Sequence, residues 1–329
     1  MEYLVTGATG VVGSHLVCHL VEAGHDVVAV TRSRSNAAHL PDEITVVEGD
    51  ITDKESLREP MTGVDGVFHI AAWAYLGPGP DNVETAERVN VDGTRNVFEL
   101  MDELEVPKGV YTSTVGLFSD VQGPVDETDL PDRPPQSVYL RTKWEAHCDV
   151  ANGFIDDGLP LVVVMPGNVF GRWDKPYGTT RGFLRAYLQE ELPMVPRDWA
   201  FPFEHAADTA RSHLRAMTHG DPGETYIIAD EARSLPALFD RAESITGVPA
   251  PRAVPSALFG VLARGMRAAE RVITPPEGFE AETLAFLSGD GVRVDNSKAT
   301  RELGIDHQSP EESLAEYFEW EQAQLAQHN

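Results

Sequence analysis

The sequence has few basic residues and no long apolar run. Its 329 residues include 53 Asp and Glu against 26 Lys and Arg, which gives a formal net charge of −27. Such an acidic chain repels phosphate backbones and anionic lipid surfaces, so we expect no nucleic-acid partner and no membrane partner. No stretch reaches the roughly 18 to 20 uninterrupted apolar residues of a membrane span.

Cysteine is scarce as well. Cys18 and Cys148 are the only two, and neither has a second Cys or a His at ligand spacing, so we expect reduced, packed side chains and no metal site. His69 and His205 also lack the partners of a metal site and are interpreted as structural. The chain opens on a strand pattern without a basic segment before it, which predicts a cytoplasmic protein without a secretory signal.

Lysine is rare even among the basic residues. Five Lys are present, whereas Arg supplies the other 21 basic groups, and the acidic residues are spread over the whole chain. A uniformly acidic, lysine-poor surface resembles proteins of extreme halophiles, in which molar salt shortens the Debye length to about 3 Å. An ordinary acidic cytosolic enzyme is the alternative.

Apolar residues make up 42% of the chain, enough for a substantial core. In the first half, short strand-like runs rich in Val and Ile alternate with amphipathic helical patterns, which predicts βαβ units and a mostly parallel sheet. The expected strands are 3–6, 26–31, 44–48, 66–70, 109–113 and 159–165, and the expected helices are 11–23, 54–60, 83–105 and 137–157. The fold class is therefore α/β, a Rossmann-type doubly wound parallel sheet.

After Pro166, Pro and Gly become frequent and helices are set off by turns. The expected helices are 182–190, 206–219, 235–246, 256–272, 281–287 and 311–327. We interpret 256–272 as a partly buried helix rather than a membrane anchor, because Arg264, Arg267 and Arg271 interrupt its apolar pattern. The predicted division is a dinucleotide-binding domain of residues 1–165, joined again by about 201–220, and a smaller, mainly helical substrate domain of 166–200 and 221–329.

The strongest motif is a glycine-rich turn between the first strand and the first helix. Gly7 permits the tight turn, Gly10 lets the backbone approach a pyrophosphate, and Gly13 allows close packing of helix on strand. The helix N-terminus adds free N–H groups and a positive dipole. In this context the pattern predicts dinucleotide binding.

The end of the second strand indicates which dinucleotide. An acidic residue would usually meet the adenosine ribose about 20 residues after the glycines. Here Arg32, Ser33 and Arg34 occupy that place, which suits a 2′-phosphate and favours NADP over NAD, with a solvated basic turn as the alternative. Asp50 could hold the adenine by a hydrogen bond and Ile51 by contact with the ring.

A catalytic pair is expected at the start of a helix. Tyr139 and Lys143 are four residues apart, so the phenol and the ammonium share one face. The unperturbed pKa of Tyr is about 10, and lowering it to 7 requires about 4 kcal/mol of stabilisation of the phenolate, part of which a nearby cation supplies. Alone, this spacing is more often an exposed pair than a site.

Taken together, the motifs resemble the extended short-chain dehydrogenase/reductases, also called the NAD-dependent epimerase/dehydratase family. The resemblance covers nearly the whole chain. The motifs that carry it are the glycine turn, Asp50-Ile51, His69-Ile70-Ala71-Ala72, Asn90-Val91-Asp92-Gly93-Thr94, Thr112-Ser113-Thr114, Tyr139 with Lys143, Pro166-Gly167-Asn168-Val169-Phe170-Gly171, His205-Ala206-Ala207-Asp208-Thr209-Ala210, Val294-Asp295-Asn296-Ser297-Lys298-Ala299 and Glu302-Leu303-Gly304.

The resemblance implies roles for individual residues. Tyr139 would be the general acid/base, Lys143 would lower its pKa and bind the nicotinamide ribose, and Thr114 would replace the usual Ser that binds the reacting oxygen. Asn90 would brace the site. The residues expected to bind the cofactor are Gly7, Thr9, Gly10, Val11, Val12, Gly13, Arg32, Arg34, Asp50, Ile51, Ala71, Ala72, Thr112, Tyr139, Lys143, Pro166, Asn168 and Val169.

Departures from the family pattern narrow the activity. At the positions of Val115 and Gly116, the sequences of sugar dehydratases in this family resemble Asp-Glu. The absence of these carboxylates here disfavours dehydration. Sugar-nucleotide epimerases usually show Arg and Tyr in the segment that here reads Met-Pro-Gly-Asn-Val-Phe-Gly over 165–171. The details look more like the dihydroflavonol-reductase-like branch, whose members reduce or oxidise a carbonyl or alcohol with NADP.

Substrate contacts are expected from less patterned segments. Aromatic residues gather in loops that follow the fourth and sixth strands, which is consistent with a largely apolar pocket. The candidates are Trp73, Tyr75, Asn168, Phe170, Tyr177 and Arg181, with Trp173 and 199–203 nearby. For each of them, plain packing is an equally good interpretation.

We therefore expect an NADP-dependent oxidoreductase, with NAD possible, that transfers a hydride between nicotinamide and a carbonyl or alcohol of a small-molecule substrate. A sugar-nucleotide epimerase and a regulatory dinucleotide-binding protein without turnover are the alternatives. A sensor would need no proton path, so the set of Thr114, Tyr139 and Lys143 argues against the regulator. Family resemblance also implies a homodimer formed through the helices of 83–105 and 137–157.

Overall fold

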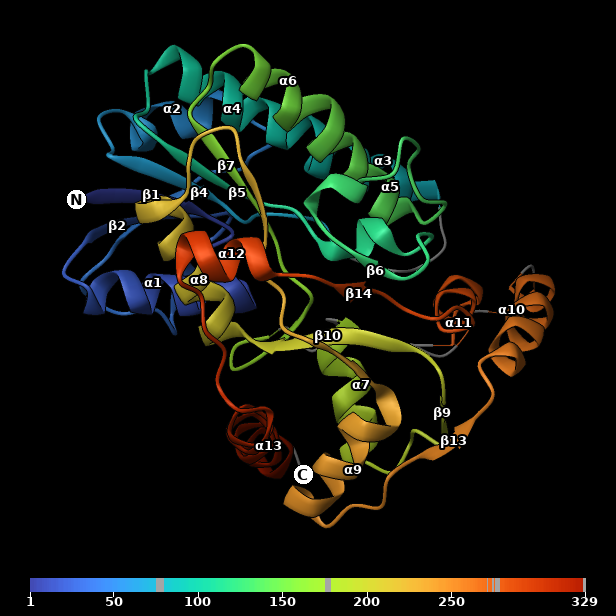
Figure 1. Cartoon of the computed structure of the whole chain (residues 1–329). Coiled ribbons are helices and arrows are strands. Elements are labelled where there is room, and N and C mark those ends of the chain that lie inside the picture. The colour runs from blue at the N-terminus through green and yellow to red at the C-terminus, as the bar shows by residue number, and fades with distance from the viewer. Residues whose placement is uncertain (75–79, 175–178, 271, 274, 276–278, 328–329) are drawn as a thin grey trace.

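A seven-stranded parallel sheet forms the centre of the molecule (Figure 1). The computed structural model describes residues 1–74, 80–174, 179–270, 272–273, 275 and 279–327. The strand order is β11-β7-β5-β4-β1-β2-β3, and every neighbouring pair is parallel. The strands are β1 (Glu2–Thr6), β2 (Asp26–Thr31), β3 (Thr45–Glu48), β4 (Gly66–His69), β5 (Gly109–Thr112), β7 (Leu161–Met165) and β11 (Thr225–Ile227). The predicted doubly wound α/β fold is confirmed.

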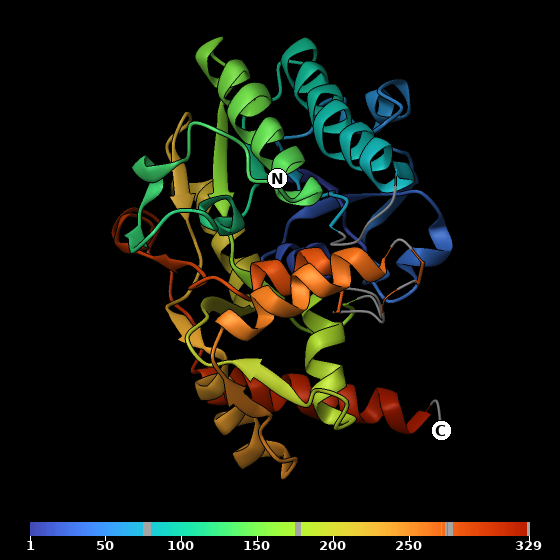
Figure 2. The ribbon, with the colours of Figure 1, turned by 90° about the vertical axis from the view of Figure 1, so that its right-hand side faces the viewer.

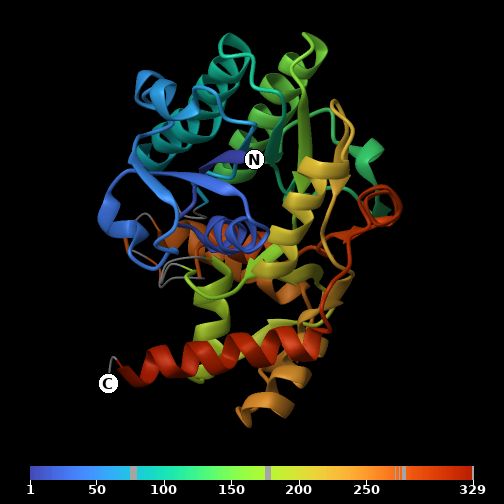
Figure 3. The same ribbon diagram turned by 90° about the vertical axis from the view of Figure 1, so that its left-hand side faces the viewer.

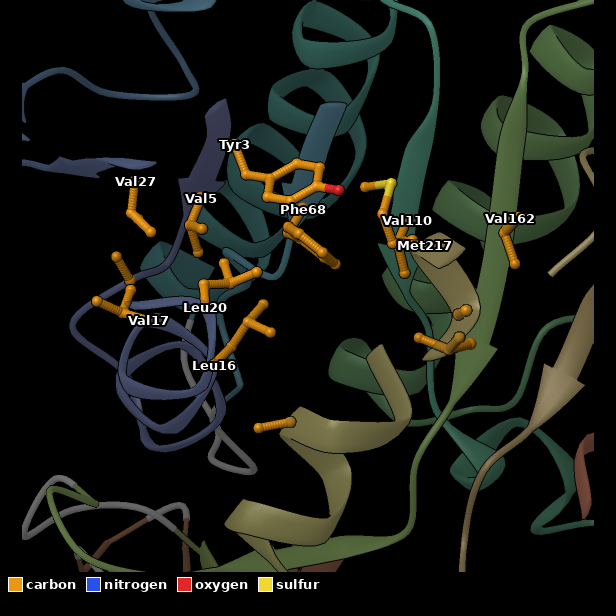
Figure 4. Packing of buried hydrophobic residues seen from close by; sticks show 14 of the residues in the cluster. Tyr3, Val5, Leu16, Val17, Leu20, Val27, Phe68, Val110, Val162 and Met217 are labelled. Atoms are coloured by element: carbon orange, nitrogen blue, oxygen red, sulfur yellow. The ribbon is translucent and has the colours of Figure 1, made fainter. Parts of the chain in front are cut away.

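Helices cover both faces of this sheet, so its central strands are apolar on both sides. One face carries α1 (Val11–Glu22), α8 (Ala206–His219) and α12 (Ser297–Leu303), and the other carries α2 (Glu55–Met61) and α4 (Gly93–Glu103). In Figure 4, Leu16 and Leu20 of α1 extend toward the sheet side chains Val5 and Phe68, and Val17 lies below Val27. The buried apolar side chains on both faces fix the positions of the loops at the carboxyl ends of the strands.

Two helices that the sequence predicts as continuous contain a π-helical segment. The first runs through α3 (Pro80–Ala86), the π segment Glu87–Asp92 and α4. The second runs through α5 (Val138–Trp144), the π segment Glu145–Ala151 and α6 (Asn152–Asp156). Such segments are frequent at functional sites, and the first of them holds Asn90.

The second part of the molecule lies below the carboxyl edge of the sheet in Figure 1 and has a core of its own. Its helices are α7 (Thr179–Leu188), α9 (Leu235–Thr246), α10 (Ala257–Ala269), α11 (Ala281–Phe286) and α13 (Pro310–Gln327). Figure 3 shows α13 along the lower edge, where it packs on α9 and β10. The six helices predicted after Pro166 are confirmed, with small shifts at their ends.

Short strands that the sequence did not predict connect these helices. β8 (Asn168–Phe170), β10 (Ala200–His205) and β12 (Ala232–Ser234) form a small sheet, β9 (Met194–Pro196) pairs with β13 (Arg252–Val254), and β6 (Pro124–Val125) pairs with β14 (Arg293–Val294). Most are only two or three residues long, so they show no alternation that a sequence pattern could reveal. Their pairing ties the second part to the loops above it.

One strand departs from the expected division of the chain. Residues 225–227 were expected in the substrate domain, yet β11 pairs in parallel with β7 at the edge of the central sheet. The chain therefore returns to the sheet twice after β7, once through α8 and β11 and once through α12. Among the described helices, none is long and apolar enough to cross a membrane.

Candidate active site

The turn between β1 and α1 leaves no space for a Cβ at two of its glycines. Gly7 has a φ of 71°, and a Cβ there would lie 2.7 Å from the backbone nitrogen of Ala71. A Cβ on Gly13 would lie 2.2 Å from the carbonyl oxygen of Gly7. Gly10 begins α1, and within the described residues no side chain caps this helix. Its first N–H groups therefore remain available to an anion, and the turn fits the pyrophosphate of a dinucleotide.

A single cavity of about 1630 Å³ begins at this turn. Its lining includes all but one of the predicted cofactor residues. These are Gly7, Thr9, Gly10, Val11, Val12, Gly13, Arg32, Asp50, Ile51, Ala71, Ala72, Thr112, Tyr139, Lys143, Pro166, Asn168 and Val169. The exception is Arg34, an exposed residue whose backbone N–H donates to Glu48 Oε1 at 3.1 Å.

Residues that follow β2 line the part of the cavity where the adenosine of a dinucleotide is expected. Arg32 is exposed on the lining, together with Asn36 of the next turn. Asp50 Oδ1 accepts hydrogen bonds from the backbone and the hydroxyl of Thr52, both at 2.9 Å, which holds the carboxylate in place. Ile51 is buried against Gly93 of α4. The site thus offers a cation, a fixed carboxylate and an apolar surface to a nucleoside.

Tyr139 and Lys143 extend from α5 toward the carboxyl end of β5. Lys143 is 3% exposed, and its Nζ donates to Tyr111 Oη at 2.9 Å and to the carbonyl oxygen of Thr112 at 2.7 Å. Burial lowers the pKa of Lys143 to about 7 and raises the pKa of Tyr139 to about 12. The expected lowering of the Tyr139 pKa by Lys143 is therefore not found in this structure, because burial disfavours the phenolate. Thr114 follows Thr112 by two residues and lines the same cavity. The structure therefore brings the predicted catalytic set together.

Tyr111 is a site residue that the sequence analysis missed. It lies in β5, one residue before Thr112, and is fully buried. Its ring also lies 4.5 Å from Lys143 Nζ, measured to the ring centroid. In the sequence, Tyr111 is an aromatic residue within an apolar strand pattern, and such a residue indicates a core position. Its position makes it the acceptor that holds the lysine.

Asn90 braces the loop after β4. Its Oδ1 accepts from the backbone N–H of Trp73 at 2.7 Å, and its Nδ2 donates to the carbonyl oxygen of Trp73 at 3.0 Å. Nδ2 also donates to Thr142 Oγ1 at 2.9 Å, and Thr142 lies in α5 between the predicted catalytic residues Tyr139 and Lys143. One amide therefore joins the π-helical segment, the loop after β4 and α5, which agrees with the bracing role that the family resemblance implies.

Two histidines support the strand ends. The ring of His69 hydrogen-bonds Thr6 Oγ1 at 2.8 Å and Thr94 Oγ1 at 3.0 Å, and burial lowers its pKa to about 3. His205 precedes α8 and accepts from the backbone N–H of Ala207. Within the residues that the structure describes, no group of acidic, His and Cys side chains could hold a metal ion. Both histidines have the structural positions expected of them.

Beyond Tyr139 the cavity continues into the second part of the molecule, where its walls are largely apolar. The apolar side chains that line this compartment come from α7, β9, β10, α9, α10, α11 and the loops beside them. They include Phe183, Leu192, Met194, Val195, Trp199, Phe201, Phe203, Leu235, Phe259, Leu262, Phe279, Leu284 and Phe286. The compartment suits a hydrophobic ligand more than a charged one.

The predicted substrate residues separate into three groups. Trp73 and Asn168 line the cavity. Phe170 is buried against the rings of His205 and Tyr317, and Arg181 forms a buried ion pair with Glu321 at 2.8 Å, so neither belongs to the cavity lining. Tyr75 and Tyr177 lie outside the described residues. For Phe170 and Arg181 the structure supports packing over substrate contact.

Comparison with known proteins places this geometry in a family. Residues 3–229 match the family described as "NAD dependent epimerase/dehydratase family". A candidate dihydroflavonol 4-reductase of Synechocystis sp. is 32% identical, with 97% of this chain and 94% of that protein covered. The sterol demethylase protein B of Methylococcus capsulatus is also 32% identical, with 97% and 98% covered.

A solved structure agrees with these sequence matches. The UDP-glucose 4-epimerase of Thermotoga maritima, determined with UDP-glucose, is 25% identical over 99% of this chain and 100% of that one, with a TM-score of 0.79. The match covers both parts of the molecule, so both parts share the fold of that structure. The chain belongs to the NAD-dependent epimerase/dehydratase family and is an NAD(P)-dependent oxidoreductase of the extended short-chain dehydrogenase/reductase type.

Proposed function

We propose that the protein is an NADP-dependent oxidoreductase that interconverts a carbonyl and an alcohol on a largely apolar small molecule. One observation carries this proposal. Thr114, Tyr139 and Lys143 line the same cavity as the glycine turn, and that cavity continues into a compartment with mostly apolar walls. The similarity to the Synechocystis protein supports the dihydroflavonol-reductase-like branch.

Each of the three residues has a role that its position allows. Tyr139, with its pKa raised to about 12, is a protonated phenol at neutral pH and can donate a proton to a carbonyl oxygen. Lys143, held by Tyr111 and Thr112, provides the positive charge that stabilises the phenolate left behind. The Thr114 hydroxyl orients the reacting oxygen. The bound nicotinamide would supply or accept the hydride.

Replacement of the phenol tests the mechanism. The variant Tyr139→Phe should lose turnover of carbonyl compounds, followed by nicotinamide absorbance, and should still bind NADPH. The variant Tyr187→Phe is the control, because Tyr187 hydrogen-bonds Thr246 and Val248 and does not line the cavity. Full activity in Tyr139→Phe would overturn the proposed role of this residue.

Arg32 carries the preference for NADP. It is the cavity-lining cation at the end of β2, so Arg32→Ala should weaken NADPH binding by about tenfold or more and leave NADH binding nearly unchanged. The variant Arg34→Ala measures whether the second arginine contributes. Arg293→Ala, which removes an exposed arginine on β14, controls for the loss of one positive charge. Equal binding of NADPH and NADH by the unmodified protein would overturn the preference.

A sugar-nucleotide epimerase is the second candidate. The Thermotoga maritima neighbour was determined with UDP-glucose, which supports this alternative. An epimerase would keep its oxidised cofactor through purification and would show no net redox change during turnover with a UDP-sugar. Net consumption of NADPH with an apolar carbonyl compound, without cofactor retention, would favour the oxidoreductase. Binding of NADPH without turnover of either substrate class would indicate the regulatory protein.

Assembly and location complete the proposal. We propose a cytoplasmic homodimer that forms through the paired helices of 83–105 and 137–157, as the family resemblance implies. Light scattering after size exclusion tests the mass. The division into a dinucleotide-binding and a substrate domain is proposed as well, with β11 assigned to the sheet of the first. The uniformly acidic composition supports an origin in a salt-adapted organism.

A further inference from the structure

The exposed large hydrophobic residues gather in one segment of the molecule. Among the described residues, Leu258, Val261, Leu262, Val272 and Ile273 are exposed, and the only other member of this group is Met1. Val261 is 60% exposed and Val272 is 83% exposed. Five such residues within sixteen positions form a patch rather than the scattered single residues that are normal on a surface.

Three residues of the patch lie on α10, and Val272 and Ile273 follow its end. Phe259 and Ala263 are buried and pack with Leu284 of α11 in a small separate core. Leu258, Val261 and Leu262 lie on other sides of the helix, with Val261 opposite this seam because a helix turns about 100° per residue. α10 is therefore apolar both on the face that packs against the rest of the protein and on the face that is exposed. Figure 1 places α10 at the edge of the molecule, and Figure 2, seen from that side, shows it in the foreground.

The charge of this segment is opposite to that of the chain. Residues 251–273 contain four Arg and one acidic residue, whereas the whole chain has a net charge of −27. Arg252, Arg264 and Arg267 are exposed. The acidic residue, Glu270, is half-buried and accepts a hydrogen bond from the backbone N–H of Ala281 at 2.7 Å. An apolar face flanked by arginines is the pattern of a helix that lies in the interface of a membrane.

The same helix is a wall of the cavity. Phe259, Leu262, Arg267 and Glu270 of α10 line it together with residues 279–289. A surface that covers the outer face of α10 would thus lie beside the compartment with apolar walls. A ligand dissolved in that surface would be close to the cavity without having to cross water.

We propose that α10 docks this protein on an anionic phospholipid surface, with Leu258, Val261, Val272 and Ile273 among the acyl chains and the arginines at the headgroups. The net charge led us to expect no membrane partner, but that expectation treated the charge as uniform. Charges more than about 10 Å away are largely screened at 0.1 M salt, so the contact depends on the charges nearest the outer face. Arg264 and Arg267 are exposed there, whereas the nearby Glu280 is buried and Glu270 and Glu282 line the cavity. Delivery of an apolar substrate from the lipid follows if the proposed function holds.

A second copy of the chain fits the patch less well. A two-fold contact through α10 would enclose the exposed Arg264 and Arg267 of both copies in one interface, because such an interface pairs the same surface patch of the two copies. A contact between α10 and a different, acidic surface would be heterologous and would give rings or open chains of molecules, which light scattering detects. The lipid surface meets the apolar face and the arginines at the same time.

Vesicle co-sedimentation of the whole protein tests the docking without any turnover. The protein should bind vesicles of phosphatidylcholine with phosphatidylglycerol, should bind phosphatidylcholine alone more weakly, and should bind the anionic vesicles less in higher salt, with its fold checked by circular dichroism under each condition. The double variant Leu258→Asp, Val261→Asp should bind about tenfold less or worse. The variant Ala323→Asp, at an exposed position on α13, adds a negative charge elsewhere and should bind like the unmodified protein.

A second measurement keeps the test valid if the double variant unfolds. A polarity-sensitive fluorophore on Val261→Cys should shift to shorter wavelength when anionic vesicles are added, and the same fluorophore on Ala323→Cys should not. No binding by the folded protein, or no shift at Val261→Cys, would overturn the proposal. So would an oligomer that the double variant converts to monomers without any vesicle binding. None of these outcomes depends on the proposed enzymatic reaction.

Discussion

Lys143 donates a hydrogen bond from Nζ to Tyr111 Oη at 2.9 Å, and the two residues form a buried pair. The phenol of Tyr111 is the acceptor, and burial holds its pKa above the ordinary value. The second bond of Lys143, to the carbonyl oxygen of Thr112, completes its described partners. The lysine is thus positioned by strand β5 rather than by its own helix.

Loss of the Tyr111 hydroxyl should change the pH profile. In Tyr111→Phe the buried ammonium keeps one acceptor, so its charged form is less stable and the pKa of Lys143 falls further below about 7. We expect the limb of kcat/KM that reports loss of the lysine charge to move to lower pH. An unchanged profile, with the variant folded, would show that the pair has no catalytic consequence.

Replacement of Lys143 should separate stability from activity. Its pKa is lowered from 10.5 to about 7, so the folded state binds fewer protons than the unfolded chain between these values, and stability rises with pH across that window. Below pH 7 the full penalty of the buried charge remains. Lys143→Met should flatten this pH dependence in thermal unfolding and lose turnover. A variant that is less stable than the unmodified protein at pH 6 would contradict the buried charge.

Glu204 should make the protein less stable in alkali. Burial raises its pKa from 4.5 to about 8, while Oε1 accepts from the backbone N–H of Gly167 at 2.7 Å. The folded state therefore binds more protons than the unfolded chain between these pH values, and stability falls as pH rises through them. Glu204→Gln keeps an acceptor for Gly167 and should remove this fall, which is on the order of a few kcal/mol.

The control for this prediction is Glu204→Ala, which removes the acceptor together with the charge. It should be less stable than Glu204→Gln at every pH, because it leaves the Gly167 N–H without its partner. Denaturant unfolding of both variants between pH 5 and pH 9 measures the difference. Equal slopes for Glu204→Gln and the unmodified protein would mean that this carboxyl does not titrate as the structure indicates.

A methyl group at Gly13 should damage both the fold and the cofactor site. The new Cβ would lie 2.2 Å from the carbonyl oxygen of Gly7, so the turn must move. We expect Gly13→Ala to lose about 2 kcal/mol of unfolding free energy or more and most of its affinity for NADPH. Gly153→Ala in α6 is the matched control, because its Cβ meets nothing within 4 Å. This helical site should gain up to about 1 kcal/mol.

Salt should stabilise the protein. A net charge of −27 causes self-repulsion that molar KCl or NaCl screens. We expect the unfolding temperature and the activity to rise toward molar salt. Sucrose at matched osmolality separates charge screening from general exclusion effects. A protein fully folded and active at low salt would leave its acidic composition unexplained.

The sequence was sufficient where the relevant residues are close together in the chain. The glycine turn and the Tyr139–Lys143 spacing are local patterns, and the turn and both side chains line one cavity. Contacts between residues far apart in the chain could not be predicted. Nothing near Lys143 in the sequence indicates that Tyr111 accepts its hydrogen bond. Arg181 shows the same limit, because its partner Glu321 lies 140 residues away.

Residue type also misled the interpretation of the loops. Phe170 and Trp73 both follow a strand that the sequence predicts, yet Phe170 lies in β8 and packs in the core, whereas Trp73 lines the cavity. The difference comes from the tertiary environment, which composition does not contain. For the same reason Glu204 gave no signal, since an acidic residue in an apolar strand has no pattern that marks it as buried.

The position of β11 has a consequence for synthesis in the cell. The seventh strand spans Thr225–Ile227 and covers the edge of β7, which ends at Met165. While the ribosome adds the intervening residues, the nascent chain carries an uncovered strand edge, a known template for mispairing. Chaperone demand should therefore peak between these two points of translation. A fragment that stops before residue 225 should aggregate, although it contains the glycine turn and all three residues proposed to be catalytic.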